Sequence, residues 1–133
     1  MPNQAVVAIV DDDPSVLEAT LDLVEAQGFA AVTFANAADF MQSGLLDSTC
    51  CLIADVQMEG MSGIELHSHL RACGRQIPTI LITGFPDPRD RRRALQDGVI
   101  CYLAKPFADR ELLACIQSAA GGAGRALPPP APA

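Results

Sequence analysis

The sequence is short of basic and aromatic side chains. It has no tryptophan, one tyrosine, and nine basic residues against 16 acidic ones, which gives a formal net charge of −7 at pH 7. Binding to a nucleic-acid backbone needs a face rich in lysine and arginine, so no direct nucleic-acid partner is expected. No apolar run approaches the roughly 18 residues of a membrane span, and no basic segment precedes an apolar one near the N-terminus. We therefore expect a soluble, cytoplasmic protein without a membrane partner.

Signatures of disulfide frameworks and zinc sites are also missing. The five cysteines form an odd set with no C-x-x-C spacing, so we expect buried thiols. His67 and His69 stand two positions apart, and on a helix such side chains point in different directions. We interpret both histidines as surface residues that cannot share a metal ion.

Short apolar runs alternate with longer amphipathic stretches through most of the chain. A length of 133 residues and a hydrophobic content of 50% suit one domain with a real core. The alternation is typical of βα units around a parallel sheet. The apolar runs predict strands at residues 6–10, 31–34, 51–54, 79–82 and 99–104. The amphipathic stretches predict helices at residues 14–27, 37–42, 62–73, 87–97 and 109–120.

Each clearly marked strand ends at a polar side chain. In a doubly wound α/β sheet, ligands bind at the edge formed by the carboxyl ends of the strands. Two carboxylates about 4 Å apart repel by roughly 4 kcal/mol at an effective dielectric constant of about 20, so three of them are tolerable only with a cation or with raised pKa values. Ligands that are all oxygen favour Mg²⁺. The side chains expected to meet at this edge are Asp11, Asp12, Asp55, Thr83 and Lys105.

Lys105 is the only lysine of the chain, since the other eight basic residues are arginines. A compact ammonium group serves as a point charge for a phosphoryl group, a task in which arginine is not equivalent. A metal ion, a lysine, a threonine hydroxyl and a free carboxylate together indicate phosphoryl transfer, with a carboxylate as the nucleophile.

Four segments in this order and spacing resemble the receiver domain of two-component response regulators. They are IVDDD at residues 9–13, DVQM at residues 55–58 with Gly63 following, LITG at residues 81–84, and KPF at residues 105–107. The resemblance covers residues 5–120 or so and implies a flavodoxin-like (βα)₅ fold, with a doubly wound, five-stranded parallel sheet in the order 2-1-3-4-5.

The resemblance also implies roles for individual residues. Asp55 resembles the phosphoacceptor, which takes a phosphoryl group from a histidine kinase or a phosphotransfer protein. Asp11 and Asp12 resemble the acidic pair that holds Mg²⁺ together with Asp55 and the main-chain carbonyl of Gln57. Lys105 would contact the phosphoryl oxygens.

Two further residues resemble the parts that carry the switch. Thr83 is similar to the hydroxyl that closes over the phosphorylated site, and Tyr102 to the aromatic side chain that swings inward with it. The peptide bond between Lys105 and Pro106 is expected to be cis, as in the family.

The sequence departs from the family at one position and carries unusual bulk at another. Family members often have proline after the methionine of the second segment, where this chain has Glu59. Gln57 and Phe85 stand at positions that the family uses to tune the lifetime of the phosphoryl bond, and we predict that Phe85 restricts water and slows hydrolysis.

Four arginines gather in the fourth predicted helix, at positions 89, 91, 92 and 93. A solvated charged face is one interpretation of Arg89, Arg91, Arg92 and Arg93. The other, implied by the resemblance, is a surface that meets an output protein or forms a phosphorylation-dependent homodimer.

The predicted function is that of a single-domain receiver at residues 1–120, a phosphoacceptor that supports only its own phosphorylation and dephosphorylation. Residues 121–133 are rich in glycine, alanine and proline, so they are expected to form a flexible tail. One alternative is a haloacid-dehalogenase-like phosphatase built on Asp11 and Asp13, which would leave Asp55 without a task. The other is a docking module that works without phosphorylation.

Overall fold

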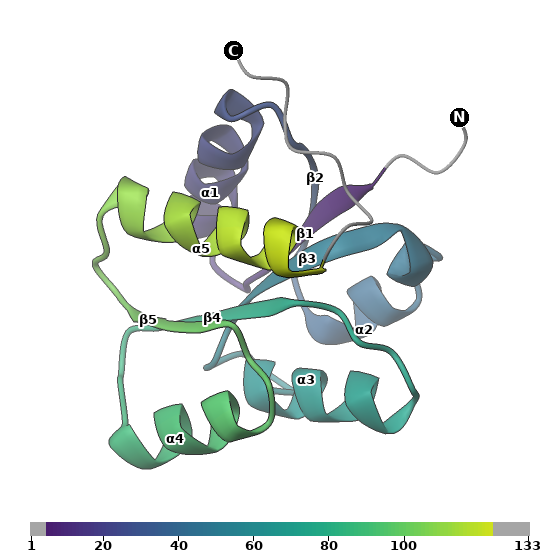
Figure 1. The fold of residues 1–133 in the computed structure, drawn as a ribbon, viewed down its shortest axis with the longest axis vertical. Coiled ribbons are helices and arrows are strands. Elements are labelled where there is room, and N and C mark those ends of the chain that lie inside the picture. Colours follow the sequence, from purple (N-terminus) through teal and green to yellow (C-terminus); the bar gives the residue numbers. More distant parts are fainter. Residues whose placement is uncertain (1–4, 124–133) are drawn as a thin grey trace.

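The described part of the chain, residues 5–123 of this computed structural model, contains five parallel strands in one sheet (Figure 1). The strands follow one another in the order β2-β1-β3-β4-β5, which confirms the predicted topology. They are β1 (Val6–Val10), β2 (Ala30–Phe34), β3 (Thr49–Asp55), β4 (Thr79–Thr83) and β5 (Cys101–Ala104).

Five α-helices and one short 3-10 helix connect the strands in this part of the chain. Four of the α-helices begin at residues whose side chains accept a backbone hydrogen bond at the N-cap, namely Asp13, Asn36, Ser62 and Asp87. The helices are α1 (Pro14–Ala26), α2 (Ala37–Met41), η1 (Leu46–Ser48), α3 (Gly63–Ala72), α4 (Pro88–Gln96) and α5 (Asp109–Ala123).

The helices cover both faces of the sheet, and each face has its own hydrophobic core. Helices α1 and α5 lie on one face, where Ile9 of β1 packs in the same cluster as Ile116 of α5. Helices α2, α3 and α4 lie on the other, where Val10 of β1 shares a cluster with Leu66 of α3. Because β1, β3 and β4 are covered on both sides, they form the continuous apolar runs seen in the sequence.

The last strand begins later than predicted because a backbone hydrogen bond of the preceding helix uses its expected first residue. The last predicted strand was expected to begin at Val99, but β5 begins at Cys101. The N–H of Val99 donates to the carbonyl of Ala94 at 3.0 Å and so closes the end of α4. Gly98, with φ of +102°, makes that turn.

His67 corrects the prediction that both histidines are surface residues. Its side chain is buried, with 6% exposure, whereas His69 is exposed. The end of α4 approaches α3 at this point, since Asp97 pairs with Arg71 at 3.4 Å. Burial lowers the pKa of the His67 imidazole below its ordinary value. Spacing within one helix could not reveal this burial, because it depends on how other elements pack around α3.

The cysteines correct a second prediction. Cys101 of β5 and Cys115 of α5 form a disulfide, with their Cα atoms 6.2 Å apart. Of the three free thiols, Cys51 is buried, Cys50 is half-buried and Cys73 is exposed. The two bonded cysteines stand 14 positions apart in the sequence, so their contact arises from the packing of α5 and has no short-range signature.

Helix α5 continues to Ala123, three residues beyond the predicted end of the domain at residue 120. The rest of the predicted tail, residues 124–133, lies outside the described residues, as do residues 1–4. None of the helices between residues 5 and 123 combines the length and apolarity needed to cross a membrane.

We expect substitution of Gly63 by alanine to destabilise the fold, although alanine is normally the better helix former. A Cβ atom at Gly63 would meet the main-chain oxygen of Asp55 at 2.5 Å and Cδ2 of Leu81 at 3.0 Å. Overpacking of this kind costs roughly 1–3 kcal/mol in the free energy of unfolding, which urea denaturation measures.

Gly84→Ala is the matched control, because a Cβ atom there meets nothing within 4 Å. We expect it to stay within about 0.5 kcal/mol of the wild type. Equal stability of the two variants would contradict the close approach of α3 to the end of β3.

Candidate functional site

The carboxyl ends of β1 and β3 bring three acidic side chains together. Val10 and Ala54 are partners in the β1–β3 register, so the residues that follow them, Asp11 and Asp55, end side by side. One carboxylate oxygen each of Asp11, Asp12 and Asp55 lies within 4.8 Å of the other two. The structure thus confirms that these three acids lie close together, as the sequence predicts.

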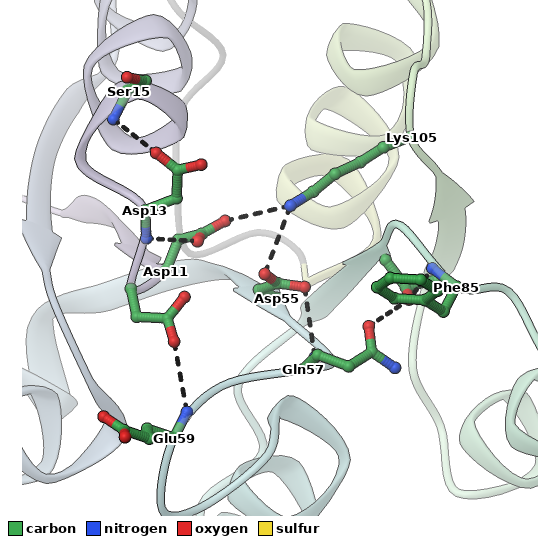
Figure 2. Close-up of polar contacts among 10 residues, drawn as sticks. Asp11, Asp13, Ser15, Asp55, Gln57, Glu59, Phe85 and Lys105 are labelled. Carbon is green, nitrogen blue, oxygen red and sulfur yellow. Dashed lines mark hydrogen bonds and ion pairs between the residues drawn. The ribbon is translucent and has the colours of Figure 1, made fainter.

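Lys105 supplies the positive charge of this cluster from the end of β5. Its ammonium nitrogen lies 3.3 Å from Oδ2 of Asp55 and 3.5 Å from Oδ2 of Asp11, as Figure 2 shows. The peptide bond from Lys105 to Pro106 is cis, as expected. One ammonium group cannot balance three carboxylates, so the site attracts a further cation.

Asp11 is the most deeply buried of the three acids, with 0% exposure. Its Oδ1 accepts a hydrogen bond from the N–H of Asp13 at 2.9 Å, whereas its Oδ2 accepts none and makes only the ion pair with Lys105. Burial raises the pKa of the Asp11 carboxyl above its ordinary value, and the neighbouring Asp55 carboxylate adds to that rise.

This environment fits a hard divalent cation. A buried carboxylate oxygen without a hydrogen-bond donor is rare in folded proteins and needs an explanation. Three carboxylates with all-oxygen donor atoms are the ligand type that Mg²⁺ binds. Asp11, Asp12 and Asp55 are therefore suited to hold such an ion.

Asp12 is exposed, and its carboxylate contacts the loop between β3 and α3. This contact could not be identified from the sequence. Its Oδ2 accepts a hydrogen bond from the main-chain N–H of Glu59 at 3.3 Å (Figure 2). A proline at position 59 would have no N–H to donate. The main-chain N–H of Glu59, at the position where the resemblance leads one to expect proline, thus connects the β3–α3 loop to the acidic cluster.

A second polar chain leads away from Asp55 through the expected switch residue. The N–H of Gln57 donates to Oδ1 of Asp55 at 3.3 Å, and the Gln57 side-chain carbonyl accepts a hydrogen bond from the Thr83 hydroxyl at 2.6 Å. The Thr83 hydroxyl in turn accepts from the N–H of Phe85 at 2.9 Å. The Phe85 side chain itself is 75% exposed. The contact between Gln57 and Thr83 has no signal in the sequence.

Tyr102 of β5 is half-buried and contacts the start of α4. Its hydroxyl accepts a hydrogen bond from the N–H of Asp87, the N-cap of that helix, at 3.3 Å. The predicted aromatic switch residue is therefore joined to α4 and not to the carboxylates.

The four arginines lie on the exposed surface of α4, outside the acidic cluster. Arg93 lines a groove of about 720 Å³ that Gln57 and Glu59 also line. Arg91 and Arg92 line a separate groove of about 470 Å³. Only the first groove borders the carboxylate site.

Comparison with known proteins gives one consistent family. Residues 7–117 match the family described as the response regulator receiver domain. The chain is 37% identical over 115 residues to the response regulator protein TodT of Pseudomonas putida, covering 86% of this chain and 51% of that protein. It is 36% identical over 116 residues to nodulation protein W of Bradyrhizobium diazoefficiens, covering 87% and 51%.

A solved structure of the response regulator StyR agrees with this. It superimposes with a TM-score of 0.80 at 38% identity, over 87% of this chain and 59% of that one. The chain spans about half the length of the curated relatives it matches.

We expect Asp11→Asn to raise the free energy of unfolding of the metal-free protein at neutral pH. The folded-state pKa of Asp11 is raised, so the folded protein binds this proton more tightly than the unfolded chain does. Stability due to Asp11 is therefore lost as the pH rises through the raised pKa. The gain from the substitution should reach roughly 1–3 kcal/mol, the range for a buried polar atom that lacks a hydrogen bond, as Oδ2 of Asp11 does.

Urea denaturation in a chelating buffer, from acidic to neutral pH, measures this difference. Asp22→Asn makes the same change on the exposed surface of α1 and should match the wild type throughout. An Asp11→Asn variant that is less stable than the wild type at neutral pH would contradict the view that the ionised Asp11 carboxylate destabilises the metal-free fold.

Proposed function

Because the chain belongs to the response regulator receiver domain family, we propose that Asp55 accepts a phosphoryl group from a histidine kinase or phosphotransfer protein. Receiver domains are phosphoacceptor signalling modules rather than enzymes, and they receive phosphoryl groups from histidine kinases. One observation carries the proposal for this chain: the Asp55 carboxylate lies close to two other acids and to the only lysine of the sequence.

Asp11, Asp12, Asp55 and the main-chain carbonyl of Gln57 would hold Mg²⁺. When bound, this ion offsets the negative charge of the carboxylates and of the incoming phosphoryl group. The Oδ2 atom of Asp11 supports this assignment, since it is a buried acceptor that has no hydrogen bond and pairs only with Lys105.

The chain's own residues then have separate tasks in the transfer. An oxygen of the Asp55 carboxylate forms a bond to phosphorus as the bond from phosphorus to the donor's histidine nitrogen breaks. Lys105, whose ammonium group already lies 3.3 Å from Asp55, stays with the phosphoryl oxygens as a point charge. Catalysis by such a site is mainly orientation and charge neutralisation.

Phosphorylation would then act as a switch. The phosphoryl group adds a charge of about −1.5 to −2 and three strong acceptor oxygens, to which the Thr83 hydroxyl turns. Tyr102 would follow and change its contact with α4, altering the surface that carries Arg89 and Arg91–Arg93. That surface would meet an output protein or a second copy of the chain, and Phe85 would slow hydrolysis of the phosphoryl bond.

The phosphatase alternative is not favoured by the contacts of Asp13. That alternative needs Asp13 as the second acid of the reaction, yet its carboxylate caps α1 by accepting the N–H of Ser15 at 2.9 Å. Membership of the receiver family also assigns the chain to phosphoacceptors rather than to enzymes.

We expect one phosphoryl group per chain after incubation with Mg²⁺ and a small acyl phosphate, as measured by intact mass spectrometry. Asp55→Asn should acquire none, because the nucleophile is gone, and a chelator should abolish labelling of the wild type. Asp22→Asn should be labelled like the wild type, since this acid is exposed on α1.

Labelling of Asp55→Asn at the wild-type level would contradict the assignment of the phosphoacceptor. A partner that binds Asp55→Asn and the unmodified wild type equally well, with no labelling of either, would instead support a docking module that works without phosphorylation.

A further inference from the structure

The Thr83 hydroxyl already donates one hydrogen bond and accepts another in the unphosphorylated protein. A hydroxyl has a single proton to donate, and that of Thr83 is directed at the side-chain carbonyl of Gln57, 2.6 Å away. Its oxygen accepts the N–H of Phe85 at 2.9 Å. The amide oxygen of Gln57 therefore accepts the one proton that this hydroxyl can donate.

This hydrogen bond must break before Thr83 can donate to a phosphoryl oxygen on Asp55. Thr83 is completely buried, with 0% exposure, so its hydroxyl has no water to exchange with. Gln57 is exposed and lines the groove of about 720 Å³ next to Arg93 and Met58. Its side chain therefore has space to move into once the hydroxyl is released.

We propose that Gln57 is a positioning residue that holds the Thr83 hydroxyl in its resting arrangement and so sets how readily the switch turns. The inference rests on the proposed function and assigns to the Gln57 side chain a task separate from that of its main chain. The main-chain N–H contacts Asp55, whereas only the side-chain oxygen contacts Thr83.

Phosphorylation overcomes this restraint because a charged phosphoryl oxygen is a stronger acceptor than a neutral amide. Without phosphorylation, the Gln57 contact favours the resting state of a two-state equilibrium. Loss of one neutral hydrogen bond should therefore raise the ratio of activated to resting protein by roughly 2- to 12-fold.

The test compares Gln57→Met and Gln57→Glu by NMR of the full chain in Mg²⁺. Methionine keeps the length of the side chain without a strong acceptor, whereas glutamate keeps an acceptor oxygen. The amide signals of Phe85 and Asp87 in the unmodified and the acyl-phosphate-treated wild type define the resting and activated positions. Gln27→Met, at the exposed C-cap of α1, is the matched control.

In unphosphorylated protein, we expect Gln57→Met to move both amide signals along the line towards the activated position. Gln57→Glu and Gln27→Met should stay at the resting position. In a Thr83→Val background, where the hydroxyl is absent, Gln57→Met should cause no further movement along this line. This last result separates an effect through Thr83 from a merely local change.

Three results would overturn the inference: no movement in Gln57→Met, the same movement in Gln57→Glu, or an undiminished effect in the Thr83→Val background. Failure of the proposed function gives a different outcome, because the wild type would then acquire no phosphoryl group and no activated position would exist. A wild type that is labelled while Gln57→Met stays at rest refutes the inference alone.

Discussion

Repulsion among Asp11, Asp12 and Asp55 is the constraint on which the rest of this site depends. One carboxylate oxygen from each lies within 4.8 Å of the others, and Asp11 and Asp55 are buried. Within residues 5–123, Lys105 is the basic side chain that forms ion pairs with two of them. Like charges at such distances oppose folding by several kcal/mol at an effective dielectric constant of about 20. The burial of apolar side chains in the two hydrophobic cores must offset this repulsive free energy.

The backbone offsets part of this charge with neutral donors. Each of the three carboxylates accepts one main-chain N–H, and each of these donors comes from a loop that follows a strand of the sheet. The loop between β3 and α3 carries two of the three donors. Its path past the carboxylates depends on α3 beginning close to the end of β3. Glycine at position 63 permits that approach. The pairs are Asp13 N–H to Asp11, Gln57 N–H to Asp55, and Glu59 N–H to Asp12.

Those features that follow from local patterns could be predicted from the sequence. Apolar runs ending in Asp11 and Asp55 located the strands and the edge where the acids meet, because parallel strands align their carboxyl ends. The burial of His67 and the disulfide from Cys101 to Cys115 could not be predicted, since both depend on how one element packs on another. The same holds for the hydrogen bond between Gln57 and Thr83, which joins the β3–α3 loop to the end of β4 through their side chains.

The central claim is that these three carboxylates form one site for a divalent cation. Anomalous X-ray diffraction from crystals soaked in Mn²⁺, which shares the preference of Mg²⁺ for oxygen ligands, tests it most directly. The account predicts an anomalous peak coordinated by the carboxylates of Asp11, Asp12 and Asp55, and loss of this peak in Asp55→Asn. A peak at another cluster of acids, or none at this edge of the sheet at saturating Mn²⁺, would contradict it.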